Sequence, residues 1–214
     1  MKTHEPSCKD TRTALLESAA RLFLARGFEA VSIRQITQAC DANVAAVNYH
    51  FNGKTNLYRE VLARQLDQIT RDKLAMLKEL AEQQPAADLA QIVATYVRNY
   101  FESQFASPDS DRLLQIIYRE MGPDAIASDL VTTRLVAPIH QAFLETILKC
   151  CPHLDGNHVS RCISSITGQV LHFIRARAIL QSLRSPAQNQ TFIEDAIDHI
   201  TRFSLRGIGS NQHA

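Results

Sequence analysis

Residues 32–51, SIRQITQACDANVAAVNYHF, decide how this chain folds. Ser32 followed by Gln35 is the pattern of a capping box, in which two side chains satisfy the free N–H groups at the start of a helix. Asn43 is a good N-cap for a second helix, and Asp41 stands in the short turn before it. The stretch therefore predicts two short, capped helices joined by a tight turn.

Two helices joined in this way form a helix-turn-helix, whose second helix lies in the major groove of DNA. Ile36 and Val47 are the apolar positions that fix how the two helices cross. The second helix carries small side chains, which allow close approach to base edges, and polar side chains near its end, which can donate to phosphates. These residues are Val44, Ala45, Ala46, Asn48, Tyr49 and His50, and Lys54 follows at the start of the next helix, where a phosphate is favoured.

The rest of the chain also has the apolar spacing of helices and no alternation typical of strands. A first helix is expected to end at Gly27, in a left-handed C-cap. A long helix follows the motif to about Gln84, and five more helices follow that one. Pro138 lies inside one of these patterns and should kink or split the helix. The predicted fold is all-α with about nine helices, divided into a helix-turn-helix domain over residues 1–53 and a helical domain over residues 54–214.

Composition limits the classes of protein that fit. The 214 residues are 45% hydrophobic with a net charge of +1, which excludes a uniformly basic coat for nucleic acid. Residues 1–81 hold 12 Lys+Arg and 9 Asp+Glu, whereas residues 82–214 hold 11 and 13, so the N-terminal part is the basic one. No segment is apolar over the length of a membrane span, and the polar start has no signal-peptide core. We therefore expect a cytoplasmic protein with no membrane partner, whose five cysteines are free thiols.

The stretch from Thr11 to Tyr58 resembles the TetR family of transcriptional regulators. The residues that carry the resemblance are Leu15, Ala19, Leu22, Phe23, Gly27, Phe28, Ser32, Ile33, Ile36, Ala39, Asn43, Tyr49-His50-Phe51, Lys54, Leu57 and Tyr58. Val47-Asn48-Tyr49-His50-Phe51 is similar to a subgroup form of the family's recognition-helix ending. Arg119-Glu120-Met121 and Pro123 are similar to the C-terminal domain of that subgroup.

The resemblance implies a homodimeric repressor that binds double-stranded operator DNA and leaves it when a small-molecule effector binds the C-terminal domain. It implies no enzymatic activity and no cofactor. Arg34 and Ala46 match base-contacting positions, while Asn48, Tyr49, His50 and Lys54 match positions that touch the DNA backbone or nearby bases. Ser32 matches a helix cap that often binds phosphate. The predicted DNA-binding residues are Ser32, Arg34, Asn43, Val44, Ala45, Ala46, Asn48, Tyr49, His50 and Lys54.

Two features of the helix-turn-helix depart from the family pattern. Asp41 stands where the family usually has Gly, but Asp tolerates the left-handed conformation, so the turn is expected to survive. The recognition helix has no Arg, Lys or Gln. Direct base readout is therefore expected mainly from Arg34, with contacts to thymine methyl groups and DNA shape supplying the rest.

Two further sets of residues are expected in the C-terminal domain. Polar residues that interrupt apolar helices can orient a ligand in a helical cavity. These are Tyr96, Tyr100, Gln115, Tyr118, His140 and His172. Two long apolar patterns near the end predict a four-helix interface between protomers, although some of their residues must serve the protomer's own core. These are Ile163, Ile166, Val170, Phe173, Phe192, Ile193, Ile197 and Ile200.

Alternatives from other classes stay open. Cys150, Cys151, His153, His158 and Cys162 suggest a metal or thiol sensor, but adjacent cysteines on a helix are poor geometry and the spacing matches no closed zinc module. Ordinary thiols and loop histidines explain them better, so no metal site is predicted. No nucleophile elbow, phosphate loop or paired-carboxylate signature appears. A helical small-molecule-binding or enzymatic protein with a vestigial DNA motif is the other alternative.

Overall fold

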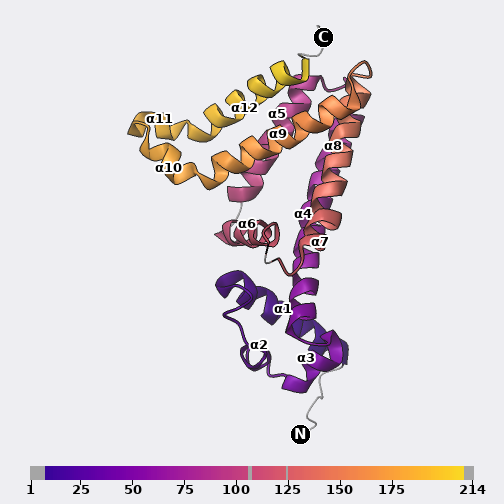
Figure 1. Cartoon of the computed structure of the whole chain (residues 1–214), viewed down its shortest axis with the longest axis vertical. Helices are drawn as coiled ribbons and strands as arrows, with labels where there is room; N and C mark the ends of the chain where they lie inside the picture. The colour runs from indigo at the N-terminus through magenta and orange to yellow at the C-terminus, as the bar shows by residue number, and fades with distance from the viewer. Residues whose placement is uncertain (1–7, 106–107, 124, 210–214) are drawn as a thin grey trace. The chain divides into compact units, whose positions relative to one another are not determined.

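The computed structural model describes residues 8–105, 108–123 and 125–209, and every regular element in these residues is helical (Figure 1). In chain order the helices are α1 (Cys8–Arg26), α2 (Ile33–Gln38), α3 (Val44–Phe51), α4 (Lys54–Glu82), α5 (Leu89–Phe105), α6 (Pro108–Glu120), α7 (Ser128–Leu130), the π-helical η1 (Val131–Val136), α8 (Ala137–Cys150), α9 (Gly156–Arg175), α10 (Arg177–Ser182), α11 (Pro186–Gln190) and α12 (Phe192–Gly209). The all-α prediction is confirmed.

The predicted number of about nine helices is too low. Because α7, η1 and α8 follow one another without a break, the described residues form eleven separate helices. One of the additional helices arises at Ala176, which leaves helical geometry with ψ at 6°, so that α9 ends before it and α10 begins after it. A further short helix, α11, begins at a capping box made by Ser185 and Gln188.

The helical run around Pro138 is continuous, so the predicted splitting does not occur. Pro138 has no N–H to donate, and its ring crowds the carbonyl group one turn earlier. The run adapts through the π-helical turn η1, which directly precedes α8. Such wider turns are a usual way for a helix to absorb a local irregularity.

The described chain forms two compact units. Unit 1 comprises residues up to 69 together with residues 111–136, and unit 2 comprises residues 70–110 together with residues from 137 onward. The units do not follow the predicted division at residues 53 and 54, because the packing groups the first part of α4, α6, α7 and η1 with the helix-turn-helix. Three short helices bury too little apolar surface to form a core alone.

The core of unit 1 contains side chains from both sequence segments that make up this unit. Leu15, Phe23, Ile36 and Val47 from the first three helices are buried in one cluster with Leu57 and Leu66 of α4, Ile116 and Ile117 of α6, and Val131. The ring of Phe23 meets that of Tyr58 edge to face at 5.2 Å. The helix-turn-helix therefore shares its core with the long helix α4.

The core of unit 2 lies among α5, α8, α9 and α12. Helix α12 packs on α5 and α9, and α8 packs on α9. Tyr96 of α5 stacks on Phe143 of α8, with ring centroids 3.7 Å apart. No helix within the described part of the chain is both long and apolar enough to cross a membrane.

Candidate nucleic-acid interface

The start of α2 is fixed by the capping box that the sequence predicts. The Ser32 hydroxyl accepts from the Gln35 N–H at 3.2 Å, and the Gln35 side-chain oxygen accepts from the Ser32 N–H at 2.8 Å. The Ser32 hydroxyl also donates to that same oxygen at 3.1 Å. Its proton is therefore already used within the box, and a phosphate contact predicted for Ser32 would compete with the cap.

The turn between α2 and α3 has the left-handed residue that the sequence analysis expects. Asp41 has a φ of 51°, and the N–H of Ala42 donates to the Thr37 carbonyl at 2.9 Å. Asn43 then begins α3, because its side-chain oxygen accepts from the Ala45 N–H at 2.8 Å. The side-chain NH₂ group of Asn43 lies on the exposed side, where it can donate to a phosphate.

Helix α3 has one buried face and one exposed face. Val47 and Phe51 are buried in the core of unit 1. On the opposite face Ala45 and Asn48 are exposed, Val44 is 45% exposed and Tyr49 is 79% exposed. Ala46 is half-buried against the core. Val44, Ala45, Asn48 and Tyr49 thus form one continuous exposed face of α3, which is available to a partner.

The end of α3 is as well defined as its start. Asn52 adopts the left-handed conformation with φ at 55°, and Gly53 follows with φ at 112°. Lys54 then begins α4, and its ammonium lies 4.1 Å from the centroid of the Phe28 ring. This cation–π contact holds the charge beside the free N–H groups of the helix start, an arrangement that suits a phosphate. The half-buried His50 packs edge to face on Tyr49.

Two arginines of unit 1 have different roles. Arg34 on α2 is exposed, and within the described residues it is recorded in no ion pair or side-chain hydrogen bond. Arg12 on α1 donates to both carboxylate oxygens of Glu60, at 2.5 and 2.6 Å, and covers the Phe51 ring. Arg12 therefore fastens α1 to α4, whereas the exposed Arg34 side chain remains available to a partner.

A buried network in unit 1 was not recognised as such from the sequence. The Glu120 carboxylate, 1% exposed, accepts from the Tyr58 hydroxyl and from the N–H groups of Ile126 and Ala127, each at 2.7 Å. The Arg119 guanidinium donates to the same Tyr58 hydroxyl at 3.0 Å. Burial, and then the bond to Glu120, raise the pKa of Tyr58. The similarity of Arg119-Glu120-Met121 to a family subgroup was the signal that pointed here.

This network ties α6 to the helix-turn-helix. Gly27 has a φ of 78°, and a Cβ atom there would stand 3.2 Å from an Arg119 nitrogen. Arg59 of α4 forms a bidentate pair with Asp129 at 2.6 and 2.8 Å, which lowers the pKa of that carboxyl. These contacts fix α6 and α7 to the helices that carry the DNA-binding residues.

The predicted effector residues are divided between the units. Tyr96, Tyr100, His140 and His172 belong to unit 2, whereas Gln115 and Tyr118 lie on α6 in unit 1. Tyr96 is buried, with its hydroxyl 3.3 Å from those of Tyr100 and Thr167. His140 bonds Ser160 at 2.8 Å, and His172 is exposed. The structure thus brings Tyr96 and Tyr100 together but not the whole set.

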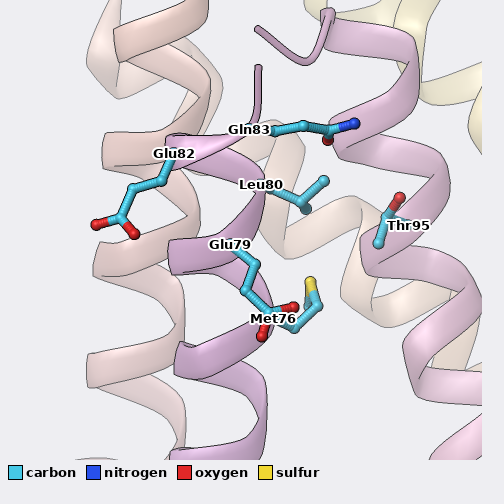
Figure 2. A pocket seen from close by; sticks show the side chains of 6 residues that line it. All are labelled: Met76, Glu79, Leu80, Glu82, Gln83 and Thr95. Carbon is cyan, nitrogen blue, oxygen red and sulfur yellow. The ribbon is translucent and has the colours of Figure 1, made fainter. Parts of the chain in front are cut away.

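Unit 2 contains two grooves that these residues do not line. The larger, of about 570 Å³, lies between the end of α4 and α5 (Figure 2). In it Leu80 and Gln83 extend toward Thr95, while the Glu82 carboxylate turns to the other side of α4. Met76 and Glu79 complete its lining. A second groove of about 270 Å³ lies between α4 and α8 and is lined in part by Leu77, Ala142 and Lys149.

Lys73, on α4 of unit 2, is a buried cation that the sequence did not identify. It is 4% exposed, donates to the Asn99 side-chain oxygen at 2.9 Å and lies 3.5 Å from the centroid of the Tyr100 ring. Burial lowers the pKa of Lys73 from 10.5 to about 7. Burial likewise raises the pKa of the Tyr100 hydroxyl.

The residues predicted for the dimer interface mostly serve the protomer's own core. Ile163, Ile166, Val170, Phe192, Ile197 and Ile200 are buried, and Phe173 and Ile193 are half-buried. Side chains without exposed surface offer little area to a second copy, as expected for those that serve the protomer's own core, and the interface itself stays a prediction. The exposed side of α9 and α12 instead carries Ser164, Gly168, His199 and Phe203, the last 59% exposed.

The candidate metal pattern does not converge. His158 bonds the Gly207 carbonyl at 2.9 Å and lies 3.6 Å from the Cys162 sulfur. Among the residues that the structure describes, no three His, Cys, Asp or Glu side chains are grouped so that they could hold a metal ion. His153 is exposed in the loop after α8.

Comparisons with known proteins agree with this arrangement. The family described as "Bacterial regulatory proteins, tetR family" matches residues 15–61, and "HTH-type transcriptional dual regulator CecR, C-terminal domain" matches residues 89–208. The HTH-type transcriptional regulator YttP of Bacillus subtilis (strain 168) is 25% identical over 127 residues, which are 59% of this chain and 58% of YttP. The aligned part thus spans little more than half of that relative's length.

Solved structures of the same fold cover nearly the whole chain. NalD, the secondary repressor of the MexAB-OprM multidrug efflux pump in Pseudomonas aeruginosa, has a TM-score of 0.58 at 20% identity, covering 94% of this chain and 98% of NalD. A transcriptional regulator from Saccharomonospora viridis, solved with choline, has a TM-score of 0.58 at 19% identity, covering 95% and 97%. At such identities the likeness establishes the fold alone. Because the CecR-type model matches more than half of the chain and the tetR model matches its helix-turn-helix, this protein belongs to the TetR family of DNA-binding transcription regulators.

Proposed function

We propose that this protein is a homodimeric repressor whose operator affinity falls when a cationic small molecule binds unit 2. The observation that carries DNA recognition is α3, which is capped at both ends and presents Asn48 and the 79% exposed Tyr49 to solvent. A rigid helix with a free polar face suits insertion into the major groove. NalD, which shares the fold, is a repressor by name, and this supports the direction of regulation.

Within this interface the side chains divide the work by chemistry. Arg34 supplies the guanidinium that can donate two hydrogen bonds to a guanine edge. Val44 and Ala45 offer apolar contacts to thymine methyl groups. Lys54 and Asn43 meet phosphates, which fixes the register of α3 without reading sequence.

Two copies of α3 are needed to read an operator of two half-sites. In a dimer they would enter successive major grooves about 34–36 Å apart. The exposed side of α9 and α12 is the face we assign to the dimer, because Phe203 and His199 stack there, 6.2 Å apart, with much of the Phe203 ring in solvent. The small Ser164 and Gly168 on the same side would allow helices of two protomers to approach closely.

The effector is assigned to the groove between α4 and α5. Its volume of about 570 Å³ lies in the range of small-molecule sites. Met76 and Leu80 provide apolar surface, and Glu79 provides a negative charge, so an effector with a positive charge and an apolar part is complementary. The choline bound to the Saccharomonospora viridis regulator is an organic cation, and this supports the same class.

The DNA-binding part is tested by measuring affinity for the protein's own promoter fragment and for random duplex DNA. Arg34→Ala should lower affinity for the promoter fragment by about 10- to 100-fold, the loss of one bidentate base contact, and should affect random DNA far less. Arg98→Ala, at an exposed arginine on α5, is the matched control and should leave both affinities unchanged. Equal losses on both DNAs would overturn the base-reading role. If the wild-type protein binds neither DNA even at low salt, the alternative of a small-molecule-binding protein with a vestigial DNA motif would be favoured.

The dimer and effector parts have their own variants. Phe203→Glu should convert the dimer to monomer in sedimentation experiments, whereas Leu183→Glu, at an exposed apolar residue directly after α10, should not. If Leu183→Glu produced monomers and Phe203→Glu did not, the dimer interface would instead be assigned to the surface near α10. Choline and longer quaternary amines should raise the melting temperature of wild type. Glu79→Gln should remove that effect, while Glu102→Gln, at an exposed position of α5 outside the groove, should retain it. Stabilisation by anionic compounds alone would contradict the assigned effector class.

A further inference from the structure

The end of α8 brings two thiols together. The Cys151 sulfur donates to the Cys150 sulfur at a separation of 3.7 Å, and the Cys150 sulfur donates to the Ala87 carbonyl at 3.6 Å. Both cysteines are free and half-buried, so reagents in solution can reach them. All three residues belong to unit 2.

The helix end explains why adjacent cysteines can meet. Successive residues of an α-helix point about 100° apart, which separates two neighbouring thiols. Here α8 ends at Cys150, and the Cys151 N–H closes the last turn by donating to the Ile147 carbonyl at 2.8 Å. Cys151 lies just beyond the helix, so its side chain is not held to the helical direction.

The distance between the two sulfur atoms matches the distance between two cysteine thiolates that bind the same metal or metalloid atom. With metal–sulfur bonds of about 2.3 Å and tetrahedral angles, two cysteines on a zinc ion stand about 3.8 Å apart. A structural zinc ion needs four ligands. The described part of the chain contains no group of three or more His, Cys, Asp or Glu side chains that could hold a metal ion. The site therefore suits a soft centre that requires only two sulfur ligands.

We infer that Cys150 and Cys151 form a dithiol site for trivalent arsenicals that carry one organic substituent. In the reaction the arsenic–oxygen bonds of the oxide break and two arsenic–sulfur bonds form. The two thiol protons leave with the oxygen as one molecule of water. Arsenic stays trivalent and each sulfur keeps its oxidation state, so no oxidant is required.

The surroundings of the pair favour this exchange over oxidation. Burial, and then the hydrogen bond from Cys151, raise the pKa of the Cys150 thiol. A thiol that holds its proton reacts slowly with peroxide, because the thiolate is the reactive form. The exchange with an arsenical oxide consumes both thiol protons as water, so the overall reaction releases no proton to solution and its equilibrium is not opposed at neutral pH by a raised thiol pKa.

Occupation of the site would also change a local contact. The Cys150 sulfur would lose the proton that it donates to Ala87, in the segment between α4 and α5. The neighbouring Lys149 ammonium donates to the Ala81 carbonyl at 2.7 Å, near the end of α4, and this bond would remain. The end of α8 would thus keep one of these two attachments to that segment.

Phenylarsine oxide is the probe for this site. The reduced full-length protein, freed of reductant, is titrated with it, and the loss of free thiols is followed by reaction with an aromatic disulfide reagent. Wild type should bind one equivalent, lose two titratable thiols, and recover both on addition of a small dithiol but not a monothiol. Intact mass should show one phenylarsenic group added per chain.

The variants separate the pair from the other cysteines. Cys150→Ser and Cys151→Ser should each weaken binding by at least about a hundredfold, because the second sulfur acts intramolecularly. Cys40→Ser and Cys162→Ser should bind as wild type does. Tight binding that survives in Cys150→Ser, or that disappears in Cys162→Ser, would overturn the assignment. Circular dichroism of each variant confirms that it is folded, and serine at two half-buried positions is a mild change.

Discussion

Among the described residues each unit buries one charged side chain, Glu120 in unit 1 and Lys73 in unit 2, and the two have very different surroundings. Glu120 accepts three hydrogen bonds at 2.7 Å and has the Arg119 guanidinium 3.7 Å away. Lys73 has one recorded acceptor, Asn99, and the face of the Tyr100 ring. An ammonium has three protons to donate, so Lys73 is the less satisfied of the two.

This difference in hydrogen-bond partners agrees with the functions proposed for the two units. A buried charge with its full set of partners stabilises one arrangement, which suits a unit that must present α3 to DNA in a fixed position. A buried charge with few partners costs stability and retains capacity for another interaction. The first arrangement agrees with the role proposed for unit 1 as a recognition scaffold, and the second agrees with the response to a small molecule proposed for unit 2.

The largest effect is expected at Glu120. Glu120→Ala would leave the Tyr58 hydroxyl and two backbone N–H groups buried without an acceptor, which should lower the free energy of unfolding by about 3 kcal/mol or more. Urea unfolding followed by circular dichroism measures this. Glu17→Ala, at an exposed position of α1, is the control and should change little. A loss below about 1 kcal/mol would mean that Glu120 does not hold unit 1 together.

Replacing Lys73 by Met should raise the free energy of unfolding, the opposite of the effect of Glu120→Ala, and the size of the change should depend on pH. Its pKa is about 7 in the folded chain against 10.5 without burial, so between these values the unfolded state binds more protons. The stability of wild type relative to Lys73→Met should therefore rise with pH from about 7 to about 10, by up to about 1.4 kcal/mol per pH unit.

The matched control for this titration is Lys78→Met, an exposed position on the same helix. Unfolding is measured at several pH values for all three proteins. Lys78→Met should show a constant difference from wild type. A constant difference for Lys73→Met as well would show that the ammonium is not buried in solution.

An intermediate effect is expected at the cap of α2. Ser32→Ala removes the acceptor for the Gln35 N–H and should lower the free energy of unfolding by about 1 kcal/mol. Ser164→Ala, at an exposed interior position of α9, should have no such cost. If the two variants melt at the same temperature, the box contributes nothing to the rigidity of unit 1.

The smallest effect is expected at an exposed ion pair of unit 2. Arg98 on α5 donates to both carboxylate oxygens of Glu194 on α12 at 2.8 Å, and both side chains are largely exposed. Arg98→Ala should cost about 0.5 kcal/mol or less, and added salt should reduce this further. A larger, salt-independent loss would show that charge pairs also fix unit 2.

Local signals explain why the helix-turn-helix was predictable. Ser32, Asp41 and Asn43 act on backbone groups within three residues of themselves, so their side-chain chemistry determines the local geometry wherever the segment lies. The left-handed Asp41 and both caps were read correctly for this reason. The exposed positions of Asn48 and Tyr49 follow from the helical period once Val47 and Phe51 are assigned to the core.

Long-range packing explains what was missed. Nothing local indicates that Glu120 meets Tyr58, or that α6 joins the core of unit 1, because those contacts cross more than 60 residues. The apolar stripes of α9 and α12 looked alike for a protomer core and for a dimer interface. The adjacent cysteines appeared unsuitable for joint ligation until the end of α8 was located between them.

By itself the sequence determined the all-helical class, the capped helix-turn-helix and the exposed face of its second helix. Each of these depends on spacing or capping, which act over one or two helical turns. Only the tertiary structure decided which helices share a core, where charges are buried and which thiols meet. Those outcomes depend on contacts between residues far apart in the chain, and hydrophobic periodicity identifies an apolar face without naming the surface that covers it.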